Sequence, residues 1–538
     1  MHAPGHLRVP SPPWVEPPRS RVKAAPAAPA AKKAKAAKAA KEASVSDAAP
    51  VPEPPEVTQA LALAPTQLLI GGGWRDARDG RTFPVLDPAT GAELCAVADA
   101  SPDDGMAALE AAAAVQHDWA RHPPRERGEI LRASYEALMD RIDELALLMT
   151  LEMGKPLADS RAEIAYAAEF FRWFSEEAVR VHGDYRVAPA GDKRILTMRQ
   201  PVGPCLFVTP WNFPMAMGTR KIGPAVAAGC TVVAKPAAET PLSMLALARV
   251  MQEAGLPAGV LNVVTTRHSG QVMEPLIRDP KARKLSFTGS TGVGRKLVEQ
   301  SAHRLLRVSM ELGGNAPFLV FADADLDAAV DGAVQAKMRN MGEACTAANR
   351  FLAHVDVATE FAERLAARLA SLTVGPGRQP GVQVGPVITE QARSGILSLV
   401  EDAAERGATV LTGGRALPGA GYFLEPTVLS DVPPEARVCR EEIFGPVAPV
   451  QSFTTESEAV ALANDTEFGL IGYVFTENLS RALRVCEDLE VGMVGLNAGV
   501  ISNPAAPFGG VKSSGFGREG GREGIEEFLE VKYVGMPG

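Results

Sequence analysis

The sequence has no run of about 18 apolar residues, the length that a membrane-spanning helix needs. It has only six cysteines in 538 residues, with no CxxC pair and no histidine cluster. This pattern argues against a disulfide framework or a zinc site and fits a reducing compartment, so we expect a cytoplasmic protein. The net charge of −9 gives no reason to expect nucleic acid, and no internal repeat is evident.

The length predicts two or three domains, and 46% hydrophobic with 22% charged residues is typical of a globular protein. Residues 1–56 differ from the rest, because they carry a charge of +4 against −13 for the remainder and have Trp14 as their only aromatic residue. This Ala-, Pro- and Lys-rich stretch predicts a disordered tail, which we extend to residue 65. An organelle-targeting peptide remains an alternative, whereas the apolar core of a secretory signal is missing.

The folded part is expected to begin near Leu68. A helical pattern runs from Asp103 to Val181, with breaks at residues 122–124 and 154–156 where prolines occur. The segment from Tyr185 to Gln200 then reads as extended, exposed chain.

From Pro201 short apolar strands alternate with helices, and the strands are CLFVTP, TVVAKPA, LNVVTT and KLSFTGS. One helix is expected to start with Thr240 as its N-cap and Pro241 as its first residue, and to stop at Gly255. This alternation predicts a parallel sheet covered on both faces, with a nucleotide at the carboxyl ends of its strands. A second α/β region follows from about Asn315 to Asn497, and the final EEFLEVKYV is an edge-strand candidate for another subunit's sheet.

Four residues or loops are candidates for chemistry. Gly289 opens a glycine-rich turn between a strand and a helix, which predicts an anion site or else a plain turn, and it is not a Walker A loop. Cys345 lies at a helix end among small and polar residues. Near a helix N-terminus its thiol would ionise readily, and a buried structural cysteine is the alternative.

Glu311, between Met310 and Leu312, is expected to have a raised pKa suited to a base. Asn212 sits between Trp211 and Phe213, so its amide could donate to an oxyanion or simply form a turn.

From about Leu68 to Val534 the chain resembles the aldehyde dehydrogenase superfamily. The motifs PWNFP, KPAxxTP, FTGST, ELGGN, a cysteine in GxxC, EEIFGP and PFGG occur in the family's order and spacing. The longer segments WNFPMAMGTRKIGPAVAAGCT and PFGGVKSSGFGREGGREGIEEFLEVKY are most similar to the succinate-semialdehyde branch.

The resemblance implies a mechanism. Cys345 attacks the aldehyde, Asn212 and the Cys345 backbone N–H hold the oxyanion, hydride passes to the nicotinamide, and Glu311 activates water to hydrolyse the thioester.

The resemblance also implies an NAD(P) site made of Trp211, Lys235, Ala238, Gly289, Ser290, Leu312 and Glu442. Relatives that prefer NAD tend to have Glu at position 238 and NADP users Ser. Ala238 therefore favours NADP slightly over NAD, and the use of both cofactors remains open. The neighbouring Glu239 could favour either cofactor.

The distal carboxylate of succinate semialdehyde would be bound by Arg220, Arg339 and Ser502, because guanidinium forks match a carboxylate. Alternatively Arg220 or Arg339 only pairs with a helix carboxylate. Another ω-carboxylated aldehyde such as glutarate semialdehyde, or a broad aliphatic specificity, also remains open.

Two departures from the branch matter. Ala347 replaces a second cysteine, so no reversible disulfide switch of that kind is expected. Glu343-Ala344 replaces Gln-Thr, and an inward-pointing Glu343 would raise the pKa of Cys345.

The expected architecture is an α/β, aldehyde dehydrogenase-like fold with a Rossmann-type cofactor domain (66–182 and 202–313) and an α/β catalytic domain (314–510). A small β oligomerisation element (183–201 and 511–538) implies a homodimer or homotetramer. A cofactor-independent thiol esterase and a noncatalytic structural protein are the remaining alternatives.

Overall fold

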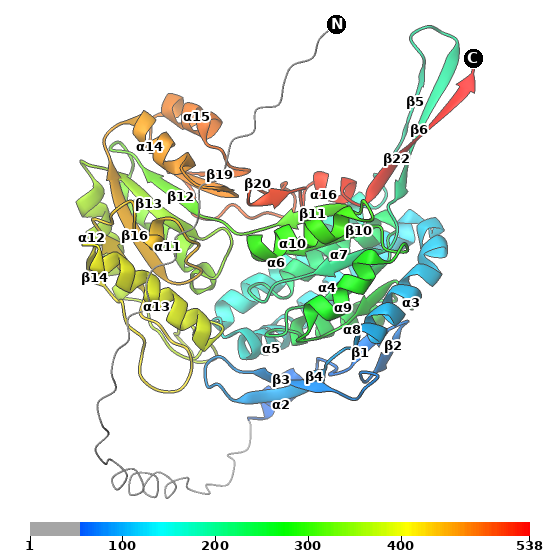
Figure 1. Cartoon of the computed structure of the whole chain (residues 1–538), viewed down its shortest axis with the longest axis horizontal. Helices are drawn as coiled ribbons and strands as arrows, with labels where there is room; N and C mark the ends of the chain where they lie inside the picture. The colour runs from blue at the N-terminus through cyan, green and yellow to red at the C-terminus, as the bar shows by residue number, and fades with distance from the viewer. Residues whose placement is uncertain (1–53) are drawn as a thin grey trace, which may run out of the picture. The chain divides into compact units, whose positions relative to one another are not determined.

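The computed structural model describes residues 54–538, and its largest sheet has eight strands in the order β2-β1-β9-β8-β7-β10-β11-β21 (Figure 1). These strands are β1 (Leu68–Ile70), β2 (Gly73–Arg75), β7 (Cys205–Val208), β8 (Val232–Lys235), β9 (Leu261–Val263), β10 (Lys284–Thr288), β11 (Arg307–Glu311) and β21 (Gly515–Phe516). The strands from β9 to β11 run parallel, whereas β1, β2 and β21 pair antiparallel at the edges. The predicted parallel sheet is confirmed.

Helices cover both faces of this sheet, as the continuous apolar strands predict. They are α3 (Pro102–Arg121), α4 (Pro124–Asp140), α5 (Ile142–Met153), α6 (Leu157–Glu177), α7 (Ala216–Ala228), α8 (Leu242–Glu253), α9 (Ser269–Arg278) and α10 (Thr291–Ala302). Phe207 of β7 packs into a core with α6, α7 and α8, whereas its neighbour Leu206 packs into a second core with α3, α9 and α10. Alternate side chains of one strand therefore stabilise opposite layers.

The helical breaks fall where the prolines predicted them. Pro123 separates α3 from α4, and Gly154, with φ of +91°, ends α5 two residues before Pro156 and α6. The predicted start of α8 was wrong. Thr240 does not cap it, because its hydroxyl donates to the Trp211 carbonyl (3.2 Å).

A distant carboxylate caps α8 instead. Glu152 of α5 accepts the N–H groups of Leu242 and Ser243 at 2.7 and 2.9 Å. Sequence patterns detect local caps, and they miss a cap that comes from 90 residues away.

The second sheet has seven strands in the order β14-β15-β16-β13-β12-β18-β19. Its strands are β12 (Ala316–Val320), β13 (Ala348–His354), β14 (Thr409–Thr412), β15 (Thr427–Ser430), β16 (Val447–Phe453), β18 (Ile471–Phe475) and β19 (Met493–Leu496). The accompanying helices are α11 (Leu326–Met338), η1 (Arg339–Gly342), α12 (Ala358–Ala370), α13 (Glu390–Glu405), η2 (Arg437–Cys439), α14 (Glu456–Asn464) and α15 (Leu479–Asp488). The predicted second α/β region is thus confirmed.

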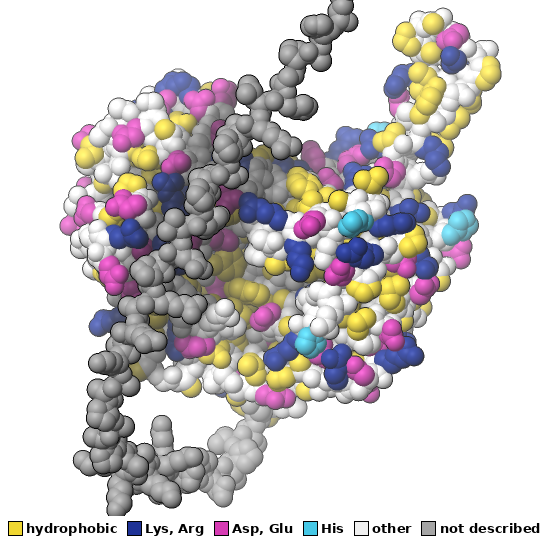
Figure 2. All heavy atoms as spheres, viewed as in Figure 1, with side chains coloured by type: hydrophobic (Ala, Val, Ile, Leu, Met, Phe, Trp, Pro, Cys, Tyr) yellow, Lys and Arg dark blue, Asp and Glu magenta, His cyan; other side chains and the backbone are white. Residues whose placement is uncertain are grey.

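A three-stranded sheet in the order β22-β6-β5 projects from the body as an arm (Figure 1). It consists of β5 (Asp184–Val187), β6 (Lys193–Pro201) and β22 (Leu529–Pro537), and it carries the exposed apolar side chains Tyr185, Val187, Val531 and Tyr533 (Figure 2). The smaller elements are β3 (Thr82–Leu86), β4 (Glu93–Ala98), β17 (Phe468–Gly469), β20 (Val511–Lys512) and α16 (Glu523–Glu526).

Two predicted segment boundaries need correction. The helix α2 (Pro55–Leu61) lies within the predicted tail, yet Val57 and Ala60 are buried in the core that also contains α5. Residues 1–53 of that tail lie outside the described residues. In the predicted oligomerisation segment 511–538, β21 instead joins the eight-stranded sheet, where Phe516 pairs with Met310. Within residues 54–538 no helix has the length and hydrophobicity to cross a membrane.

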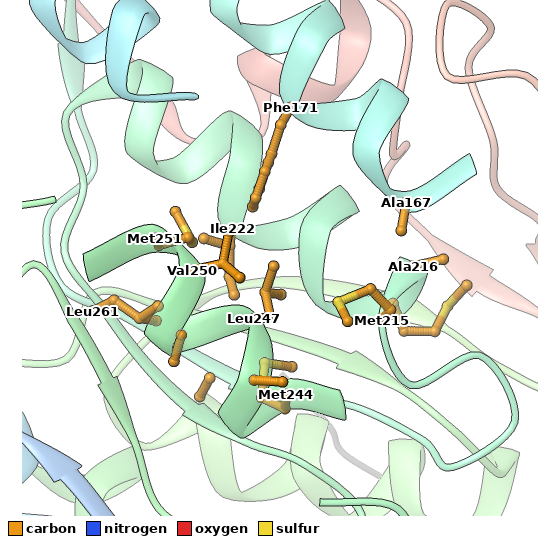
Figure 3. Close-up of a cluster of buried hydrophobic side chains, with 14 of the residues drawn as sticks. Ala167, Phe171, Met215, Ala216, Ile222, Met244, Leu247, Val250, Met251 and Leu261 are labelled. Carbon is orange, nitrogen blue, oxygen red and sulfur yellow. The ribbon is translucent and has the colours of Figure 1, made fainter. Parts of the chain in front are cut away.

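This packing can be tested in the core between α6, α7 and α8, where the side chains interdigitate closely (Figure 3). Leu247 of α8 is fully buried there. We predict that Leu247→Ala lowers the free energy of unfolding by roughly 2–5 kcal/mol, because it removes apolar contacts and leaves a cavity. Urea denaturation measures the loss, with Leu479→Ala as the control because Leu479 is 71% exposed. Equal stability of the two variants would contradict this packing.

Candidate active site

The carboxyl ends of the parallel strands gather the residues that sequence analysis selected. These are Trp211 and Asn212 after β7, Lys235 at the end of β8, Gly289 and Ser290 after β10, and Glu311 at the end of β11. Because parallel strands end at one edge, residues from four separate motifs come together there.

Two cavities, of about 320 and 210 Å³, are lined by residues that follow these strands. The smaller one contains Cys345. Its lining includes Trp211, Asn212, Gly289, Ser290, Leu312, Cys345 and Glu442, all of them predicted, together with Phe444 and Met217. The thiol of Cys345, the amide of Asn212 and the predicted cofactor residues therefore line one cavity.

Cys345 reaches this cavity from the second sheet, between η1 and β13. The residue follows a helix end, as predicted, but no helix begins beside it, so a helix N-terminus does not lower the pKa of its thiol. Asn340, Met341 and Gly342 have φ of +53°, +54° and +79°, and this left-handed run turns the chain from α11 toward the cavity. A side chain at Gly342 would approach the Gly445 carbonyl oxygen to 2.2 Å, so the turn requires glycine.

The surroundings of Cys345 do not favour its thiolate in the free protein. Burial raises the pKa of Cys345 to about 12, and Glu311 and Glu442 raise it further, against the opposing charges of Arg220 and Arg339. The expectation of a readily ionised thiol was therefore wrong, since desolvation outweighs the nearby guanidiniums.

Glu343, the acid two residues before Cys345, points away from it. One carboxylate oxygen accepts the Ile388 N–H (3.0 Å), and burial raises the pKa of Glu343 well above its usual range. The backbone carbonyl of Glu343 instead accepts the Asn212 side-chain amide (3.0 Å). Because this contact uses the backbone of residue 343, it does not depend on the Glu side chain that departs from the branch.

A buried ion pair also holds the Asn212 loop. Lys155 Nζ lies 2.5 Å from Glu163 Oε2 and donates to the Asn212 carbonyl at 2.7 Å. Glu163 Oε1 accepts the N–H groups of Met215 and Ala216 at the start of α7. The amide of Asn212 is therefore positioned from both sides.

Glu311 is 4% exposed, and its Oε2 has no hydrogen-bond partner among residues 54–538. Burial and the neighbouring Glu519 raise the pKa of Glu311 well above its usual range. This agrees with the predicted direction. A side chain at Gly509, in the PFGG motif, would approach Glu311 Oε1 to 2.9 Å, so this glycine admits the carboxylate.

Sequence reasoning missed a buried cation beside Glu311. Lys221 of α7 is paired with Glu519 and donates to Ser286 at 3.0 Å. Two consecutive basic residues, Arg220 and Lys221, on a helix with no exposed residue were the available signal.

The charges of two predicted substrate residues, Arg220 and Arg339, act on the pKa of Cys345, but neither they nor Ser502 belong to the lining of its cavity. Arg339 donates to Ser502 at 3.0 Å, and its guanidinium lies over the rings of Tyr166 and Phe213. Arg220 Nε is 2.6 Å from Glu519 Oε2, so Arg220 does pair with a carboxylate, the alternative left open above. Its NH2 nonetheless has no partner among residues 54–538.

The predicted cofactor residues fit a dinucleotide. No side chain caps the N-terminus of α10, so its first N–H groups are available to a phosphate. Leu312 packs against Gly294 so closely that a side chain there would come within 2.4 Å, which draws α10 onto the sheet. Glu442 lines the Cys345 cavity, whereas Ala238 lines the larger one.

Residues 74–534 match the model of the aldehyde dehydrogenase family. The chain is 57% identical over 443 residues to a succinate-semialdehyde dehydrogenase of Paenarthrobacter nicotinovorans, covering 82% of this chain and 98% of that protein. It is 50% identical over 468 residues to a glutarate-semialdehyde dehydrogenase of Pseudomonas putida, covering 87% and 97%. The crystal structure of an Escherichia coli NADP-dependent enzyme superposes with a TM-score of 0.87 at 49% identity, covering 88% and 99%.

The raised pKa of Cys345 can be tested directly. We predict that the cofactor-free protein shows no thiolate from Cys345 below about pH 9, because a buried thiol keeps its proton. The measurement is the ultraviolet absorbance of thiolate against pH, taken as the difference between the natural protein and Cys345→Ser. A difference signal already present at about pH 7 would contradict the burial argument.

Proposed function

The chain belongs to the aldehyde dehydrogenase family, and on that premise we propose that it oxidises succinate semialdehyde to succinate with NAD(P) as the hydride acceptor. The single observation that carries this proposal is the cavity that Cys345 and Asn212 share with the predicted cofactor residues.

Cys345 is the nucleophile. Its sulfur bonds to the aldehyde carbon and gives a thiohemiacetal, and loss of hydride from that carbon gives a thioester. The nicotinamide, when bound, accepts the hydride. The thiol must lose its proton first, and the raised pKa means that a base has to take it.

Asn212 and the Cys345 backbone N–H stabilise the negative oxygen of the thiohemiacetal. Asn212 Nδ2 uses one hydrogen on the Glu343 carbonyl and can donate the other into the cavity. Because Lys155 and Glu163 hold the loop in advance, little reorganisation is needed when charge develops.

Glu311 is the base that takes a proton from water, whose oxygen then attacks the thioester and releases the acid and the thiol. A raised pKa makes the ionised carboxylate of Glu311 a stronger base than an exposed one. Two charges of the Lys221–Glu519 pair act on Glu311. Glu519 favours its protonated form, and Lys221 favours its ionised form.

Arg339 and Ser502 bind the distal carboxylate, and the free NH2 of Arg220 adds a further donor. Since Glu519 already neutralises much of Arg220, Arg339 makes the larger contribution. A longer ω-carboxylated aldehyde such as glutarate semialdehyde remains the alternative, because one relative of similar identity bears that name.

We further propose a homodimer or homotetramer. The β5–β6–β22 arm exposes Tyr185, Val187, Val531 and Tyr533 on an open sheet, which favours burial against another copy. The division into cofactor, catalytic and oligomerisation segments and the cytoplasmic location are likewise proposals, supported by the separate sheets and by six unpaired cysteines.

The oxyanion role of Asn212 predicts that Asn212→Ala lowers kcat about 100-fold or more. Steady-state formation of reduced cofactor measures this loss. The rate of Cys345 alkylation by iodoacetamide serves as the control, since it should stay near that of the natural protein if only the oxyanion donor is lost. An unchanged kcat would refute the role.

The carboxylate role of Arg339 predicts that Arg339→Ala lowers kcat/KM for succinate semialdehyde by about 10- to 100-fold, because a charged hydrogen bond is lost. The uncharged butanal should change much less. Arg440→Ala is the matched control, since Arg440 is an exposed arginine paired with Asp465. Equal losses for both aldehydes in Arg339→Ala would exclude the role. A panel with glutarate semialdehyde shows which chain length is preferred.

A further inference from the structure

Lys337 is a buried cation that the proposed mechanism does not use. It lies in the last turn of α11, its side chain is 0% exposed, and its Nζ has no hydrogen-bond partner among residues 54–538. Burying an ammonium group without a partner is costly, because the group gives up its water and gains no hydrogen bond in return. A lysine in this state therefore needs a physical explanation.

The loop that carries Glu442 lies against the end of α11. A side chain at Gly342 would come within 2.2 Å of the Gly445 carbonyl oxygen and within 3.2 Å of the Lys337 carbonyl oxygen. Gly342 thus lets the EEIFGP loop approach the last turn of the helix. At this separation the charge of Glu442 acts on Lys337, and the charge of Lys337 acts on Glu442.

The backbone on both sides of Glu442 is fixed by one side chain. Asn349 of β13 donates to the Glu441 carbonyl (3.0 Å) and accepts the Ile443 N–H (3.2 Å). The position of Glu442 relative to α11 is therefore set by the second sheet.

The carboxylate of Glu442 is open to a ligand in the cavity that contains Cys345. Glu442 lines that cavity, and its Oε1 accepts the Gly314 N–H (3.0 Å). Its Oε2 makes no hydrogen bond to the described residues, and Gly313, which has no side chain, leaves room beside this oxygen. An ionised carboxylate in this place can accept hydroxyl groups from a bound ligand.

Near neutral pH the amine of Lys337 and the carboxylate of Glu442 compete for one proton. Burial lowers the pKa of Lys337 to about 7, against the charge of Glu442. Burial raises the pKa of Glu442 to about 7, against the Gly314 N–H and the charge of Lys337. Together the two groups thus hold about one proton at pH 7. A hydroxyl that donates to the carboxylate favours its ionised form, and the proton then belongs on the amine.

We infer that Lys337 is a positioning residue that acts through Glu442: its buried amine takes up the proton that Glu442 gives up when the carboxylate binds the hydroxyl groups of a ribose. The inference deepens the proposed function and rests on it for the identity of the ribose. Lys337 does not line the Cys345 cavity, so its effect reaches the ligand only through the charge of Glu442.

The first experiment measures the ionisation of Glu442 in the full chain without cofactor. The infrared C=O band of its protonated carboxyl group is identified as the band that Glu442→Gln removes. In the natural protein this band should disappear as the pH rises through about 7. In Lys337→Met it should persist to a pH about one unit higher or more, because the opposing charge is gone. An identical titration in the two proteins would overturn the inference.

The second experiment counts protons by calorimetry, with NADPH and NADH as probes, in two buffers that differ in their enthalpy of ionisation. At pH 7 the natural protein should release almost no proton on binding, because Lys337 takes it up. Lys337→Met should release up to about one proton and bind about ten-fold more weakly, and its affinity should recover as the pH rises. Equal proton release by the two proteins would contradict the role of Lys337.

Two further variants complete the calorimetry. Lys337→Arg keeps a positive charge behind Glu442 and should retain most of the affinity at pH 7. Lys281→Met removes a lysine that is paired with Glu110 on the surface, and it should leave both affinity and proton release unchanged.

Melting temperatures separate this role from a purely structural one. A cation in the last turn of a helix can stabilise the helix C-terminus, and in that case Lys337→Met would melt earlier with no change in Glu442. We expect it to melt at the same temperature or higher, since the Nζ has no partner to lose. The matched control is Lys284→Met, which removes a buried lysine paired with Glu527 and should melt earlier.

The infrared and melting measurements need neither cofactor nor aldehyde, so their outcome is independent of the proposed function. If the natural protein oxidises the aldehyde and Lys337→Met leaves the titration of Glu442 unchanged, this inference alone fails. If the natural protein binds neither NADPH nor NADH, the proposed function fails, and the role of Lys337 in ribose binding fails with it.

Discussion

The candidate active site depends on the buried ion pair between Lys155 and Glu163. Glu163 of α6 accepts the N–H groups at the start of α7, and Lys155 holds the carbonyl of Asn212 in the middle of the loop after β7. Removing either partner would leave an uncompensated charge in the core, which costs several kcal/mol. Asn212 is thereby positioned by charges that do not themselves line the cavity.

Two sheets contribute to the same cavity, and glycines allow them to approach. A side chain at Gly314 would come within 2.5 Å of the Cys345 carbonyl oxygen, and one at Gly313 within 2.9 Å of Glu442 Oε2. The ELGGN motif therefore does more than follow Glu311, because it lets the loop that carries Cys345 and the loop that carries Glu442 lie against the first sheet. The burial that this packing produces raises the pKa values of Cys345 and Glu311.

Predictions from local pattern held where the signal was local. Apolar runs located β7, β8, β9 and β10, and prolines located the ends of α3 and α5. Predictions failed where a partner distant in sequence intervened. Glu152 replaced Thr240 as the cap of α8, and burial reversed the expected ionisation of Cys345. The pairing of Arg220 with a carboxylate was left open by the sequence, and its partner Glu519, 299 positions away, is one that no periodicity indicates.

The sequence by itself determined the order of strands and helices, the family, and the residue types at the site, because these follow from periodicity and from motifs with characteristic spacing. Only the tertiary structure decided which of these residues meet, which carboxylates are already engaged, and in which direction burial shifts each pKa. The reason is physical. Desolvation and pairing depend on neighbours in space, and for Cys345, Glu311 and Arg220 the decisive neighbours come from elements far away in the chain.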